Sequence, residues 1–172
     1  MLCGVADRDH DQVDRLVAQW ADERPDLDLD AMATVARLLN LARAIKGRLA
    51  ALAADYDLSI PEADVLFTLR RAGGPYRLSP SAISDALLVP SGTMTNRLDR
   101  LERKDLIERV RHPTDRRSME VQLTDRGRKL VDEAVARHVE NEKEMLAPLS
   151  ERERATLDRL ARRLLAHLGA QS

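Results

Sequence analysis

The chain of 172 residues has a formal net charge of −1, and 44 % of its residues are hydrophobic although only 2 % are aromatic. This length fits one domain, and a core so poor in aromatic rings must be built from leucine, valine and alanine, as in helical proteins. No apolar run approaches the roughly 18 residues that cross a bilayer, the start lacks the pattern of a secretory signal, and the single cysteine excludes an internal disulfide. We therefore expect a cytoplasmic, mainly α-helical protein.

Two helices are expected before residue 58. Over residues 7–23 the apolar residues recur with helical spacing, at Val13, Leu16, Val17 and Trp20. Arg24-Pro25 ends this helix, and a longer apolar stripe predicts a second helix over residues 30–54. Residues 1–40 hold 4 basic and 9 acidic side chains, so the acidic charge of the chain is concentrated here.

The segment after residue 58 opens with a capping signal. Ser59 and Glu62 have the spacing of a capping box, in which each side chain bonds the backbone N–H of the other residue. A helix is therefore expected to begin here and to run to about residue 72, where Gly73-Gly74-Pro75 stops it. Residues 76–78 are expected to form a short strand.

A second start signal, Ser79 followed by Pro80, predicts another helix. Its inward-facing residues are expected to be Ile83, Leu87 and Leu88. About three residues then lead into a further short helix, and two short helices joined in this way form a helix-turn-helix.

The helix expected over residues 91–103 has the features of a DNA-recognition helix. Met94, Leu98 and Leu101 recur at i, i+4 and i+7 and are expected to face inward. The opposite face carries small, amide and guanidinium groups, which suit a major groove because asparagine pairs with adenine and arginine with guanine or phosphate. The residues expected to face DNA are Ser91, Thr93, Thr95, Asn96 and Arg100.

After residue 105 the apolar period changes from helical to alternating. Residues 106–111 and 118–123 are predicted to form two short strands. The turn between them carries Arg116 and Arg117, which are expected to enter the negatively charged minor groove. Residues 92–129 hold 11 basic and 7 acidic side chains, which puts positive charge beside the predicted DNA-facing helix.

Two more helices are expected at the end of the chain. Thr124 caps one over residues 125–147, and Ser150 with Glu153 forms a capping box that opens the last. The residues expected to face inward on the last helix are Leu157, Leu160, Leu164, Leu165 and Leu168. No sheet is available to cover these apolar faces, so residues 7–58 and 125–172 are expected to form the dimerisation helices of a homodimer. Residues 59–124 would form the DNA-binding lobe of a single domain over residues 1–172.

The sequence offers no pattern of an enzyme. Its histidines lie on unrelated segments, at His10, His112, His138 and His167. They have no cysteine, aspartate or glutamate at the spacing of a metal site or a catalytic triad, and no glycine-rich phosphate loop is present. Cys3 has acidic neighbours, which do not favour the thiolate of a redox sensor. We therefore expect no catalytic residue, no cofactor and no metal.

The wing segment carries a family resemblance. Asp115-Arg116-Arg117-Ser118, followed by Val121-Gln122-Leu123-Thr124, resembles the wing signature of the MarR family of bacterial transcriptional regulators. The resemblance covers nearly the whole chain and implies a mainly α fold with a small β-wing, in which N- and C-terminal dimerisation helices flank a winged helix-turn-helix. It also implies a homodimeric repressor that binds a pseudo-palindromic double-stranded DNA operator and releases it when a small anionic or aromatic ligand binds. The alternative is a winged-helix dimerisation or protein-interaction module without ligand response.

The additional N-terminal helix resembles the urate-responsive branch of that family. The residues that match the ligand-binding positions of this branch are Trp20, Asp64, Arg97 and Arg109. Urate, or another small anion or phenolic compound, would stack on Trp20 and be held by arginine forks. Three of these residues also have a simpler interpretation. Trp20 can be a core residue, Asp64 can compensate a helix dipole, and Arg97 can lay its aliphatic stem over the core with its charged group in water.

Overall fold

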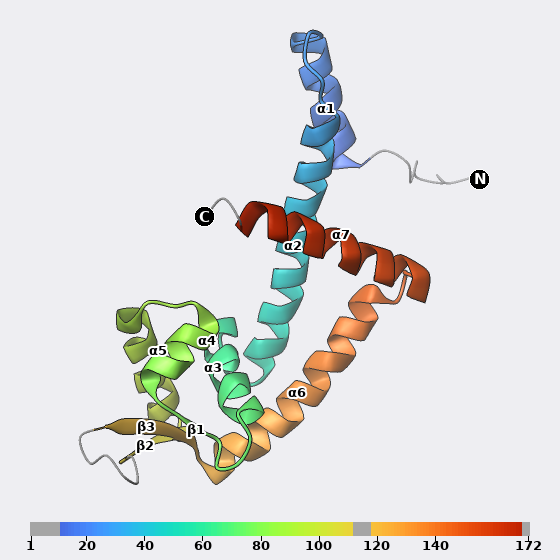
Figure 1. The fold of residues 1–172 in the computed structure, drawn as a ribbon. Coiled ribbons are helices and arrows are strands. Elements are labelled where there is room, and N and C mark those ends of the chain that lie inside the picture. Colours follow the sequence, from blue (N-terminus) through green and yellow to red (C-terminus); the bar gives the residue numbers. More distant parts are fainter. Residues whose placement is uncertain (1–10, 112–117, 170–172) are drawn as a thin grey trace. The chain divides into compact units, whose positions relative to one another are not determined.

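The computed structural model describes residues 11–111 and 118–169. The chain divides into two compact units, one up to Arg48 and one from Leu49 onward, which are described separately. The expected mainly α fold with a small antiparallel sheet is confirmed. The elements, labelled in Figure 1, are α1 (Gln12–Glu23), α2 (Asp30–Asp55), α3 (Ile60–Arg71), β1 (Arg77–Leu78), α4 (Pro80–Leu87), α5 (Ser91–Arg103), β2 (Ile107–Arg111), β3 (Met119–Leu123), α6 (Asp125–Leu146) and α7 (Glu151–Gly169).

In the first unit, ion pairs between charged side chains join the start of α1 to α2. Asp11 caps α1 by accepting hydrogen bonds from the backbone N–H of Val13 and Asp14, at 2.8 and 3.0 Å. Arg37 on α2 donates to Asp11 at 2.9 Å and to Asp14 at 2.5 Å. Arg37 and the capped N–H groups lower the pKa of Asp11 to about 2. Val13 is buried, whereas Trp20 stays 46 % exposed, so Trp20 is not a core residue of this unit.

The sheet of the second unit has the strand order β1-β3-β2, and both pairings are antiparallel. Val121, at the centre of β3, lies opposite Leu78 on β1 and Arg109 on β2. It is completely buried. The sheet therefore has one face against the helices, and β2 and β3 form the expected pair of wing strands.

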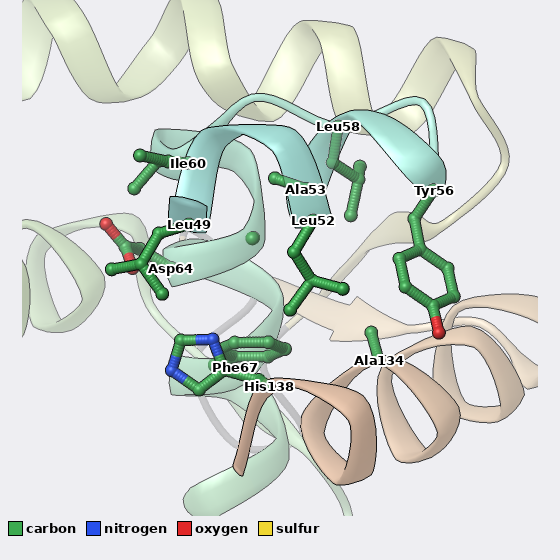
Figure 2. A pocket seen from close by; sticks show the side chains of 11 residues that line it. Leu49, Leu52, Ala53, Tyr56, Leu58, Ile60, Asp64, Phe67, Ala134 and His138 are labelled. Carbon is green, nitrogen blue, oxygen red and sulfur yellow. The ribbon is translucent and has the colours of Figure 1, made fainter. Parts of the chain in front are cut away.

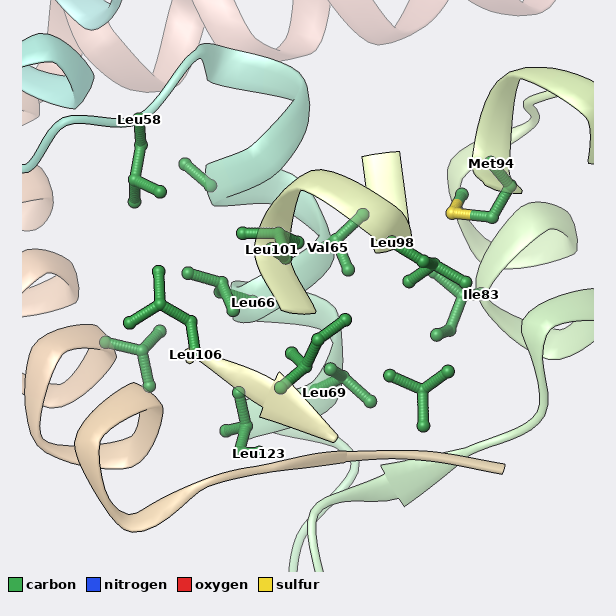
Figure 3. Packing of buried hydrophobic residues seen from close by; sticks show 14 of the residues in the cluster. Leu58, Val65, Leu66, Leu69, Ile83, Met94, Leu98, Leu101, Leu106 and Leu123 are labelled. Atoms are coloured by element: carbon green, nitrogen blue, oxygen red, sulfur yellow. The ribbon is translucent and has the colours of Figure 1, made fainter. Parts of the chain in front are cut away.

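The core of the second unit gathers around α3, which contributes Val65, Leu66 and Leu69, all completely buried. Figure 3 shows side chains of α3 and α5 and strand residues packed together in this cluster. The apolar stripe of α5 faces inward as predicted, since Met94, Leu98 and Leu101 are at most 2 % exposed. Burial of one such side chain contributes about 1.5–3 kcal/mol, so this stripe fixes how α5 is rotated about its axis.

Leu88, predicted to face inward, is instead 92 % exposed, and that prediction is wrong. Leu88 is the C-cap of α4 and adopts a left-handed conformation, with φ 52° and ψ 46°. A residue in this conformation ends a helix by turning the chain away from its axis, and it is usually a glycine. The chain leaves the helical period at Leu88, so its side chain no longer follows the inward stripe that holds Ile83.

The capping residues of α3, α4, α6 and α7 are those that the sequence predicts: Ser59, Ser79, Thr124 and Ser150. The start of α6 is also tied to the turn that follows α5. The backbone N–H of Thr124 donates to Leu106 O at 3.2 Å, and its hydroxyl donates to Asp105 O at 2.8 Å. Arg126 Nη1 donates to Lys104 O at 3.0 Å. These bonds place the first turn of α6 directly against the segment that joins α5 to β2.

The apolar face of α7 is not covered within one chain. No residue of α7 is buried, and Leu165 and Leu168 are 70 % and 60 % exposed. These leucines are expected to be buried against a second copy, and that burial stays a prediction. None of the helices in the described ranges is long and apolar enough to cross a membrane.

We predict that Gly127→Ala destabilises the protein by about 1–3 kcal/mol, the range typical of overpacking. A Cβ at Gly127 would overlap the carbonyl oxygen of Leu106, which is backbone and cannot rotate away. The control is Gly47→Ala on α2, where nothing lies within 4 Å of an added Cβ and alanine favours a helix. Urea unfolding measures both, and a stability for Gly127→Ala equal to the wild type would contradict the packing described above.

Candidate nucleic-acid interface

The N-terminal half of α5 presents neutral hydrogen-bonding groups to solvent. The exposed residues there are Ser91, Gly92, Thr93, Thr95 and Asn96. Thr95 Oγ1 donates back to Ser91 O at 3.3 Å, so its lone pairs remain available to accept. The first N–H groups of a helix have no partner within the helix and favour an anion such as a phosphate. This end of α5 can therefore meet both a phosphate and the edges of bases.

Arg100, one turn beyond Asn96, is held by a buried carboxylate. Its Nε donates to Glu62 Oε1 at 3.0 Å, and the Arg100 side chain stays 46 % exposed. Glu62 also accepts hydrogen bonds from the backbone N–H and the hydroxyl of Ser59, both at 2.8 Å, and lies 3.7 Å from Lys104 Nζ. Burial alone would raise the pKa of Glu62, but these hydrogen bonds and the two cations hold it below its ordinary value. Glu62 is therefore charged at neutral pH.

The wing arginines Arg116 and Arg117 lie outside the described residues, so their place in a minor groove stays a prediction. The strands on either side are described. Arg111 at the end of β2 lies opposite Met119 at the start of β3. On β1, Arg77 donates to Gln122 Oε1 from Nε and Nη2, at 3.0 and 2.6 Å. Arg77 is not among the residues that the sequence pattern predicts to contact DNA, although an arginine on a short strand beside a helix-turn-helix could have indicated that it lies near this surface.

Arg109 on β2 is tied to two carboxylates of the recognition helix. Its Nη2 donates to Asp99 Oδ1 at 2.5 Å, and its Nη1 donates to Glu102. Asp99 and Glu102 are three residues apart, so they lie on one face of α5. The family resemblance places Arg109 at a ligand-binding position, but the sequence pattern does not predict its bonds to Asp99 and Glu102. An anionic ligand that engages Arg109 must therefore compete with the bonds that join β2 to α5.

A small cavity lies between the end of α2, α3 and α6, and Asp64 lines it. Figure 2 shows Asp64, Phe67 and His138 among the side chains of Leu49 and Leu52. The volume is about 60 Å³, enough for a few water molecules. The rings of Phe67 and His138 meet edge to face, with centroids 5.3 Å apart.

The electrostatics of this cavity single out Asp64. Burial raises the pKa of Asp64, and attraction to Arg97 on α5, to Arg71 on α3 and to His138 on α6 opposes that rise. Neither Arg97 nor Arg109 lines the cavity. Trp20 belongs to the other unit, and its part in the same pocket stays a prediction. Among residues 11–111 and 118–169, no cluster of three histidine, cysteine or acidic side chains could hold a metal ion.

The chain resembles known regulators in sequence and in fold. Residues 56–118 match the family model of the MarR family. The chain is 43 % identical to the HTH-type transcriptional regulator PecS of Dickeya dadantii (strain 3937) over 157 residues, which are 91 % of this chain and 95 % of PecS. A mutant MarR from E. coli, solved in complex with operator DNA, has a TM-score of 0.67 and 26 % identity and covers 80 % of this chain and 97 % of its own. The S. aureus MepR–DNA complex gives the same TM-score and identity over 78 % and 96 %.

We predict that Asp64→Asn raises the melting temperature at neutral pH. The folded state raises the pKa of Asp64 above its ordinary 3.8, so its charged form costs stability. The gain should vanish below pH 3.8, where Asp64 is protonated in both the folded and the unfolded chain. Glu62→Gln should show the opposite sign, because the pKa of Glu62 is lowered and its charge stabilises the fold above its ordinary 4.5. Melting curves from about pH 7 to about pH 3 test both signs, and no gain for Asp64→Asn at pH 7 would contradict the first.

Proposed function

The chain belongs to the MarR family of transcriptional regulators, and on this premise we propose that it is a homodimeric repressor that binds a pseudo-palindromic DNA operator. The observation that carries the proposal is the exposed N-terminal half of α5, whose opposite side is buried in the core. A regulator of this kind works where the chromosome lies, so its proposed location is the bacterial cytoplasm. The named relatives are transcriptional regulators, which supports a binding function in place of catalysis.

We propose that the protein recognises bases with α5 and binds the neighbouring DNA backbone and minor groove with the wing formed by β2 and β3. Asn96 and Arg100 would contact base edges in the major groove, where asparagine and arginine have specific partners. The hydroxyl groups of α5, on Ser91, Thr93 and Thr95, would meet phosphates at the helix N-terminus. Arg116 and Arg117 would enter the adjacent minor groove, as basic side chains do where the groove is narrow.

The proposed dimer explains the apolar faces that one chain leaves exposed. α7 exposes Leu157, Leu160 and Leu164 in addition to Leu165 and Leu168. Exposed contiguous apolar faces on a soluble protein usually mark an interface. A two-fold dimer would present two copies of α5 about 34–36 Å apart, one turn of DNA, which matches a pseudo-palindromic operator.

We propose that a small anionic or phenolic ligand such as urate weakens DNA binding through Trp20, Asp64, Arg97 and Arg109. Two of these residues bear on the recognition helix: Arg97 belongs to α5, and Arg109 holds Asp99 and Glu102 of α5. A ligand anion that attracts these arginines would therefore change the position of α5. The cavity at Asp64 is smaller than a urate ring, so the side chains around it must move to admit one. Such a ligand acts as a switch because it binds the two positions of α5 with different affinity.

A competition titration tests the proposed function. The probe is a duplex selected from a random-sequence pool by the wild-type protein, and the competitor is random duplex DNA. A sequence-specific regulator should prefer the selected duplex by about 10³-fold or more. Equal affinity for both DNAs would instead support the protein-interaction module.

We predict that Asn96→Ala lowers affinity for the selected duplex by about 1–3 kcal/mol and leaves random duplex nearly unchanged, since it removes a base contact. The double variant Arg116→Ala with Arg117→Ala should weaken both DNAs. It should also reduce the slope of log K against log salt by about 0.9 for each lost phosphate contact. Fluorescence anisotropy over a salt series measures these changes. An unchanged slope in the double variant would remove the wing from the interface.

We predict that Trp20→Ala and Arg97→Ala each abolish ligand-induced release from DNA. Thermal shift with urate, salicylate and small di- and tricarboxylates identifies the ligand, and the fluorescence of Trp20, the single tryptophan of the chain, should change when it binds. The matched control is Leu16→Ala, which removes another exposed apolar side chain of α1. A Trp20→Ala variant that binds DNA and is released like the wild type would exclude Trp20 from the sensor.

A further inference from the structure

Glu62 holds a position that capping alone does not explain. It is 4 % exposed, and its two oxygens have different partners. Oε2 accepts from the backbone and the hydroxyl of Ser59, whereas Oε1 accepts from Arg100 Nε at 3.0 Å. One carboxylate therefore joins the start of α3 to the outer face of the recognition helix. We propose that Glu62 is a positioning residue that orients Arg100 for reading a base pair of the operator, an inference that rests on the proposed function.

The contact uses one edge of the guanidinium and leaves the other available. A guanidinium carries five N–H donors in a rigid plane, so fixing Nε fixes the direction of both terminal amino groups. Among the described residues, no partner is recorded for Arg100 Nη1 or Nη2, and the side chain is 46 % exposed. These two amino groups form the fork that pairs with the O6 and N7 atoms of guanine.

Arg100 also lies on the correct side of the helix. Four residues turn a helix by about 400°, so Arg100 is offset by only about 40° from Asn96. Asn96 belongs to the exposed half of α5 that the proposed function places in the major groove. A groove that receives Asn96 therefore receives the free edge of Arg100 one turn further along.

Glu62 is a rigid support because the fold holds it in place. Its Oε2 is bound to the capping residue Ser59, and Lys104 Nζ lies 3.7 Å away. These contacts keep Glu62 charged and fixed before DNA arrives. An arginine that is already oriented loses less side-chain freedom on binding, and this loss is a main cost of a polar contact at an interface.

The opposite role is that Glu62 neutralises Arg100 and keeps it away from DNA. The two roles predict different results. A positioning residue strengthens the preference for one base pair, so its removal weakens operator binding. A neutralising residue suppresses non-specific binding, so its removal frees a cation, strengthens binding to random DNA and steepens the salt dependence by about 0.9 for each new phosphate contact.

A double-mutant cycle on the selected duplex tests the inference. Glu62→Gln and Arg100→Ala should each lower affinity for that duplex by about 10-fold, within the range of one base-reading contact. The double variant should lose no more than Arg100→Ala alone, because Glu62 acts only through Arg100. The matched control is Glu153→Gln on α7. Glu153 forms the same kind of capping box, with Ser150 at 2.8 and 2.6 Å, and among the described residues it has no arginine of α5 as a partner. Glutamine also serves at this position of a capping box, so this variant should leave DNA affinity unchanged.

Arg100→Lys provides a second test that leaves the Ser59–Glu62 cap intact. Lysine keeps the charge but lacks the planar fork, so it cannot bond Glu62 and guanine together. This variant should lose preference for the selected duplex while its salt slope stays unchanged. Wild-type behaviour of Arg100→Lys, additive losses in the cycle, or stronger random-DNA binding by Glu62→Gln would each overturn the inference and leave the proposed function intact. A wild-type chain with no preference for any duplex would overturn both.

Discussion

Burial of Met94, Leu98 and Leu101 against α3 is the constraint on which the proposed DNA-binding surface depends. These side chains are at most 2 % exposed, and rotating α5 about its axis would bring them into water. The core thus decides which residues of α5 face outward, and it leaves Asn96 and Arg100 outside. The inner side of α5 therefore belongs to the apolar core and its outer side forms the proposed DNA-binding surface. A substitution in the core that rotates α5 would also move the residues that face outward.

Two carboxylates on α3 show how neighbouring residues can have opposite electrostatics. Glu62 has hydrogen bonds and two cations that lower its pKa, whereas Asp64 lines an apolar cavity that raises its pKa. Glu62 therefore stabilises the fold in its charged form, and Asp64 costs stability in its charged form. Groups that cost stability are common at functional sites. The contrast favours Asp64, and not Glu62, as a group that a ligand could influence.

The parts of the fold that the sequence predicted are those with local causes. Capping residues such as Ser59 and Thr124, and the apolar stripe of α5, depend on residues within one or two turns, so their spacing is visible in the sequence. The bond from Arg100 to Glu62 joins residues 38 positions apart, which no helical period reveals. The bonds from Arg109 to α5 depend on the path of β2. Leu88 was mispredicted because a left-handed cap interrupts the helical period.

In the proposed complex, the N-terminal half of α5 enters the major groove of DNA. Dimethyl sulfate footprinting on a selected duplex tests this most directly, because the reagent attacks guanine N7 in that groove. If α5 enters this groove, two patches of guanines should be protected, with centres about 10 base pairs apart, one for each copy of α5 in a dimer. Guanines that stay fully reactive under a saturating amount of protein would contradict it.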